Sequence, residues 1–251
     1  MTRMKGPAVR EAVAEGDLRI AHVLPNILTV LGLCAGATAI PFALASNWKA
    51  AVTAIVLAAI FDTLDGRIAR YFGTDTDFGA QLDSLADLVS FGIAPAMLVY
   101  LWMLHRAGGA GWAMALIFCV CGAIRLARFM TQSLPEEGAE PEPFFVGVPT
   151  PAAACLILLP LIISFQFPGP VFANPVVSAT MVAICSLLMV SRMPTPSLKA
   201  IHLPQGARGP ALGFAGLLLG FAILWPWSTL TGCLVIYLAS LPFAARAHET
   251  D

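Results

Sequence analysis

Four aspartates stand inside apolar stretches of this sequence, where a charged side chain is costly. Asp62 and Asp65 are three residues apart, and Asp83 and Asp87 are four apart. On helices, both spacings place the two carboxylates of a pair on one face. A carboxylate at membrane depth is retained only beside a compensating charge. Carboxylate oxygens are the ligands that Mg²⁺ and Mn²⁺ prefer, so these residues predict a site for divalent cations.

Residues beside the two acidic pairs suggest what these cations would act on. Gly66 and Gly79 lie on the expected helices, where a glycine costs about 1 kcal/mol relative to alanine. Such a glycine fits a position that a ligand or another backbone approaches closely. Arg70 lies one turn beyond Gly66, and its guanidinium can hold a diphosphate through paired hydrogen bonds.

The composition places these residues in a membrane protein. Of the 251 residues, 58% are hydrophobic and only 12% are charged, about half the charged fraction of a soluble domain. Recurrent long apolar runs are typical of transmembrane helices, and they predict an all-α protein, a polytopic helix bundle. The eight expected spans are 24–45, 50–71, 79–103, 109–130, 151–167, 172–191, 209–225 and 228–245.

The spans divide the chain into three parts. Residues 1–20 are polar and are expected to form a cytoplasmic segment, either an amphipathic helix on the membrane surface or a frayed tail. Residues 21–200 form the expected catalytic transmembrane core. Residues 201–251 supply two additional transmembrane helices and a short tail.

The basic residues predict the orientation of the bundle. With eight spans, both termini lie on one side of the membrane. Of the lysines and arginines, only Lys49 and Arg106 then lie on the other side. By the positive-inside rule the termini and the acidic pairs are cytoplasmic, in a multi-pass protein of a bacterial inner or plasma membrane.

The net charge of −1 gives no field that would attract nucleic acid. The six cysteines lie in apolar runs without zinc-ligand spacing, which favours free thiols.

The spacing of the acidic, glycine and arginine residues resembles the signature of the CDP-alcohol phosphotransferases. That resemblance implies six core helices, a site at the cytoplasmic membrane boundary, and displacement of CMP from a CDP-linked substrate by an incoming hydroxyl. The matching positions are Asp62, Asp65, Gly66, Ala69, Arg70, Gly79, Asp83 and Asp87.

The same resemblance implies roles for individual residues. All four aspartates would hold two divalent cations, Mg²⁺ or Mn²⁺, and Asp87 would also accept the proton of the attacking hydroxyl. The positions implied to contact the CDP moiety are Asn26, Thr29, Gly66, Arg70, Thr76 and Gly79.

Within that family, four stretches are similar to the integral-membrane phosphatidylserine synthases. They are 78–95, 125–129, 145–154 and 191–199. This similarity implies CDP-diacylglycerol and L-serine as substrates, the lipid bilayer as the surroundings and a homodimer as the assembly. The last two spans lie outside the six-helix core, and no chemistry is assigned to them.

Several alternatives stay open at this point. Arg125 and Arg128 would bind the acceptor or the phosphates, or else only anchor the bundle at the membrane surface. The acceptor could instead be glycerol 3-phosphate, inositol or choline. The four aspartates could line a divalent-cation transporter, or belong to a structural protein without activity. They could also form only salt bridges, to Arg67, Arg70, Arg125 and Arg128.

Overall fold

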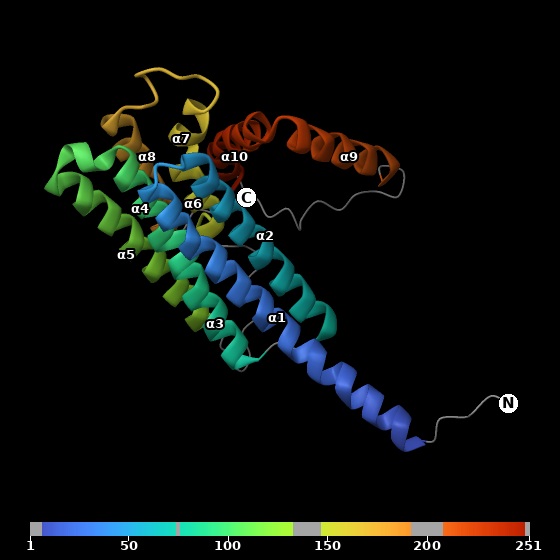
Figure 1. Cartoon of the computed structure of the whole chain (residues 1–251). Coiled ribbons are helices and arrows are strands. Elements are labelled where there is room, and N and C mark those ends of the chain that lie inside the picture. The colour runs from blue at the N-terminus through green and yellow to red at the C-terminus, as the bar shows by residue number, and fades with distance from the viewer. Residues whose placement is uncertain (1–6, 74–75, 133–146, 192–207, 249–251) are drawn as a thin grey trace.

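The computed structural model describes residues 7–73, 76–132, 147–191 and 208–248, and these form helices without any strand. Figure 1 shows an elongated bundle from which the N-terminal part of the first helix projects. The all-α fold expected from the sequence is confirmed. The helices are α1 (Pro7–Leu44), α2 (Trp48–Phe72), α3 (Asp77–Asp87), α4 (Ala94–Trp102), α5 (Gly109–Gln132), α6 (Thr150–Ile157), α7 (Leu159–Ser164), α8 (Pro175–Val190), α9 (Arg208–Leu224) and α10 (Pro226–His248).

Helix α1 is the element against which the site helices pack. It forms an antiparallel hairpin with α2, and the two make the most extensive helix pair of the bundle (Figure 1). Asn47 caps the start of α2 by accepting a hydrogen bond from the Ala50 amide at 3.3 Å. Gly73 ends α2 in the left-handed conformation, with φ of 60°. No helix end falls near residue 20, where the sequence suggested a boundary, because α1 continues through it.

The second and third expected spans contact each other along part of their length. Helix α3 packs against α1 and α5, whereas α2 packs against α1, α4, α6 and residues 88–93. Helix α1 packs on both α2 and α3, and Figure 1 shows it running between these two helices in that view.

The third span is not one regular helix. A π-helical segment, η1 (Leu88–Ile93), separates α3 from α4 directly after Asp87. Such wide turns inside α-helices occur often at functional sites. The segment is buried against α1, where the Ser90 hydroxyl is 3.4 Å from the Gly32 carbonyl oxygen to which it donates. Glycines on α1 are what allow this close approach.

The remaining helices complete the core. Helix α5 packs on α8, and α6 packs on α8 and η1. The expected fifth span is broken into α6 and α7 because Pro160 has no N–H to continue the helix. A short 3₁₀ turn, η2 (Leu104–Ala107), leads into α5. Fully buried side chains of this core include Ile55, Phe118 and Leu156.

Helix α10 is attached to the core, whereas α9 extends away from it (Figure 1). The Gln166 side chain after α7 donates to the Thr231 hydroxyl at 2.9 Å and accepts from the Ser228 hydroxyl at 2.7 Å. Beside this pair, the rings of Phe165 and Trp227 pack edge to face, 4.8 Å apart. These contacts fix the first turns of α10 against α7.

Three helices are long and apolar enough to cross a membrane, among the residues that the structure describes. They are Val23–Leu44, Asp77–Trp102 and Gly109–Thr131; Pro175–Val190 and Pro226–Leu241 are shorter apolar helices. A polytopic helical membrane protein is consistent with this result. The count of eight spans stays a prediction.

The contact between α1 and η1 can be tested through Gly36. A Cβ at this position would lie 2.7 Å from the Ser90 Cα, so Gly36→Ala forces the two helices apart. We expect a loss of about 1–3 kcal/mol, seen as a thermal unfolding midpoint several degrees lower in detergent. Gly216→Ala on α9 is the control, since nothing lies within 4 Å of its added Cβ. Equal midpoints for the two variants would contradict this packing.

Candidate metal and nucleotide site

Both acidic pairs line one pocket, which is partly open to the surroundings. Its walls come from α1, α2, α3 and η1, so residues far apart in the sequence meet there. The lining residues are Thr29, Gly32, Leu33, Ala58, Asp62, Asp65, Asp83, Ala86, Asp87, Ser90 and Phe91.

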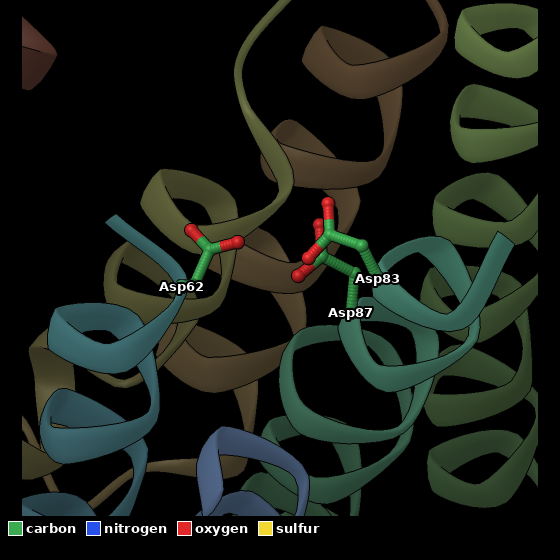
Figure 2. A group of neighbouring side chains, drawn as sticks. All are labelled: Asp62, Asp83 and Asp87. Atoms are coloured by element: carbon green, nitrogen blue, oxygen red, sulfur yellow. The ribbon is translucent and has the colours of Figure 1, made fainter. Parts of the chain in front are cut away.

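Three of the four carboxylates form a compact cluster. One oxygen each of Asp62, Asp83 and Asp87 lies within 4.8 Å of the others. Figure 2 shows Asp83 and Asp87 side by side on α3, facing Asp62 on α2. An all-oxygen donor set at this separation fits a hard divalent cation, and the cluster gives the predicted site a geometry.

Asp65 lines the same cavity but lies outside this cluster. It is only 4% exposed, and its Oδ2 accepts a hydrogen bond from the Thr29 hydroxyl at 2.7 Å. A neutral donor holds the orientation of this carboxylate without cancelling its charge. Thr29, expected to contact the nucleotide, therefore also positions Asp65.

None of the four aspartates forms an ion pair with a lysine or arginine in the described part of the chain, so the salt-bridge alternative has no support there. Arg67 and Arg70, on the same helix as Asp62, have exposed side chains. Like charges this close in an apolar bundle repel strongly, and a bound cation or a proton would compensate them.

Three of the expected nucleotide contacts come together at the start of α3. Thr76 caps this helix, and its hydroxyl accepts from the Gly79 amide at 3.1 Å. A Cβ on Gly79 would lie 3.1 Å from both the Thr76 hydroxyl and the Asn26 side-chain oxygen. Asn26 and Thr76 thus crowd Gly79, and a side chain there would force them to shift by a few tenths of an ångström. A second group forms on α2, where the Arg70 guanidinium lies over Gly66, 3.6 Å from where its Cβ would be.

Arg125 and Arg128 do not share a role in the structure. Arg125 donates from Nη1 to the hydroxyl of the fully buried Thr150 on α6. Arg128 is exposed and donates to the Val190 carbonyl at 3.1 Å, at the end of α8. A basic side chain there satisfies a carbonyl that the helix leaves unpaired. The same helix end is approached by Gly147, whose φ of 84° only glycine adopts readily.

Sequence reasoning missed two polar residues of the site region. Ser90 lines the cavity and is buried at 2% exposure, and Thr150 holds Arg125 in place. Ser90 stands three residues after Asp87, and that spacing was the only sequence feature that could have indicated its place in the site. Thr150 stands at a helix start, where a hydroxyl residue is ordinarily interpreted as a cap.

The comparisons with known proteins agree with this geometry. The profile of the CDP-alcohol phosphatidyltransferase family matches residues 22–191. A Mycobacterium tuberculosis protein named CDP-diacylglycerol–serine O-phosphatidyltransferase is 36% identical over 231 residues, 91% of this chain and 80% of that protein. A Helicobacter pylori protein of the same name is 32% identical, over 72% of this chain and 74% of that protein. A Bacillus subtilis protein of the same name is 34% identical, over 71% of this chain and 92% of that protein.

An all-helical bundle with carboxylates gathered in one pocket defines a polytopic membrane protein with a candidate site for divalent cations. Within that class, this chain belongs to the CDP-alcohol phosphatidyltransferase family. The matched region contains every residue of the signature and ends one residue after α8.

The repulsion within the carboxylate cluster predicts an effect on stability. Asp62→Asn removes one of three crowded negative charges. We therefore expect a higher thermal midpoint than the unmodified protein in EDTA, together with loss of most of the stabilisation by added Mn²⁺. Asp77→Asn, an exposed aspartate at the start of α3, is the control that keeps the Mn²⁺ effect. Full Mn²⁺ stabilisation of Asp62→Asn would contradict the cluster as the cation site.

Proposed function

We propose that this protein transfers the phosphatidyl group of CDP-diacylglycerol to the hydroxyl of L-serine, with release of CMP. The observation that carries the proposal is the meeting of Asp62, Asp83 and Asp87 in one cavity, beside the residues that match the family's nucleotide contacts. Relatives named for the serine reaction, in species of separate bacterial groups, support serine as the acceptor.

The aspartates would hold two divalent cations, Mg²⁺ or Mn²⁺. Asp62, Asp83 and Asp87 supply one group of ligand oxygens, and Asp65 supplies a further carboxylate in the same cavity. When bound, such cations polarise the diphosphate and neutralise the charge that develops on the leaving CMP. Because Thr29 fixes Asp65 by a hydrogen bond, that carboxylate is oriented before any ligand arrives.

In the proposed chemical step, Asp87 is the base. Its carboxylate accepts the proton of the serine hydroxyl while the hydroxyl oxygen attacks the phosphorus that carries the diacylglycerol. The bond from that phosphorus to the CMP oxygen breaks, and CMP leaves. The π-helical segment η1 begins at the next residue, so Asp87 lies at the junction of α3 and η1.

The nucleotide would be bound by the two groups already described. The Arg70 guanidinium over Gly66 supplies donors for the diphosphate, and Asn26 and Thr76 beside Gly79 supply polar atoms for the cytidine part. Arg70 and Thr76 are exposed, as access from the aqueous side requires. We further propose that this side is the cytoplasm and that the protein is a homodimer in the bilayer.

Serine as the acceptor is tested by a panel of acceptors. Purified protein with Mn²⁺ and CDP-diacylglycerol should release CMP with L-serine, and much less with glycerol 3-phosphate, inositol or choline. CMP release with one of these and none with serine would reject the acceptor and keep the family chemistry. Metal uptake into proteoliposomes without CDP-diacylglycerol, and no CMP release, would favour a transporter.

The proton acceptor is tested by Asp87→Asn. An amide cannot accept the hydroxyl proton, so we expect turnover to fall by at least about 10²-fold while the protein still folds. The measurement is CMP release at saturating serine, beside Asp77→Asn as the control on the same helix. Turnover within a few-fold of the unmodified protein would remove Asp87 from this role.

A further inference from the structure

Two buried polar atoms without a partner lie near each other on α5 and α10. The Arg125 Nε and the Tyr237 hydroxyl have no hydrogen bond in the described structure, although both are shielded from solvent. Arg125 reaches Thr150 on α6, and α10, which carries Tyr237, packs on α6 and α7. An unsatisfied buried polar group costs about 1–3 kcal/mol, so two together indicate the place of a bound polar group.

The guanidinium of Arg125 presents a particular edge to this place. Its Nη1 is already committed to the Thr150 hydroxyl, which leaves the edge that carries Nε–H. A guanidinium edge matches a carboxylate in geometry and charge, and a phenol hydroxyl donates well to the second carboxylate oxygen. Helix α5, which carries Arg125, packs on α3 and η1, the elements that hold Asp87 and Ser90.

Tyr237 is held in position by the attachment of α10. The hydrogen bonds of Gln166 and the ring contact of Trp227 fix the start of this helix against α7. Tyr237 follows about three turns later and packs against the core. The family match ends at residue 191, so this tyrosine comes from a part of the chain to which the family resemblance assigns no function.

We propose that the Tyr237 hydroxyl and the Nε edge of Arg125 together bind the carboxylate of an amino-acid acceptor. Helix α10 is then a specificity element of the enzyme. A serine held by its carboxylate at this place directs its hydroxyl toward Asp87, whereas inositol and choline have no carboxylate to be held. This inference rests on the proposed function and adds to it a residue that selects the acceptor.

The test is Tyr237→Phe in the full-length protein, assayed by CMP release with L-serine and with serinamide. The variant should fold, because the hydroxyl that it loses has no partner within the protein. We expect the KM for serine to rise about tenfold, with kcat and the KM for CDP-diacylglycerol changed less than twofold. The preference for serine over serinamide should shrink by a similar factor.

The matched control is Tyr100→Phe, a tyrosine on α4 whose ring packs on Trp112. It should leave both the KM for serine and the serinamide preference unchanged. Arg125→Lys keeps the charge but loses the Nε edge, and it should also raise the KM for serine.

Two results would overturn the inference. If serine supports CMP release and Tyr237→Phe leaves its KM and the serinamide preference unchanged, the inference fails and the proposed function stands. If the unmodified protein releases CMP only with acceptors that lack a carboxylate, both fail.

Discussion

Negative charge gathered in an apolar bundle is the constraint on which this structure depends. Asp62, Asp83 and Asp87 bring ligand oxygens within 4.8 Å of one another, and Asp65 adds a fourth charge to the same cavity. No ion pair balances them in the described residues, and the one side-chain donor to Asp65 is the neutral Thr29 hydroxyl. Such an arrangement costs stability unless a bound cation or a proton compensates the charge, so the binding of a cation would stabilise the site.

The fold holds these charges together through the approach of backbones. Helix α1 packs on both α2 and α3, and its glycines let the π-helical segment after Asp87 pack closely on it. The pocket that holds the aspartates is lined by residues of α1, α2, α3 and η1. Helices α5 and α10 carry Arg125 and Tyr237, the two residues that we propose bind the carboxylate of the acceptor.

Much of the site could be predicted from the sequence, because helical spacing alone puts each acidic pair on one face. The arrangement of the helices could not. Nothing in the residue pattern indicates that α1 packs on both α2 and α3, because that contact depends on tertiary packing. The hydrogen bond from Arg128 to the Val190 carbonyl at the end of α8 is likewise absent from the pattern, and the expected role of Arg128 at the acceptor or the phosphates stays a prediction. No sequence feature predicted a functional role for Tyr237, because an aromatic residue in an apolar run is ordinarily interpreted as part of the core.

We propose that a pair of divalent cations neutralises the aspartates, which have no ion-pair partner in the described residues. Electron paramagnetic resonance of Mn²⁺ titrated into the protein in lipid nanodiscs with CDP-diacylglycerol measures this directly. We expect two bound Mn²⁺ ions per chain, close enough for their spins to couple, and loss of the coupled signal in Asp83→Asn. One isolated ion per chain, or none above the level of empty nanodiscs, would contradict it.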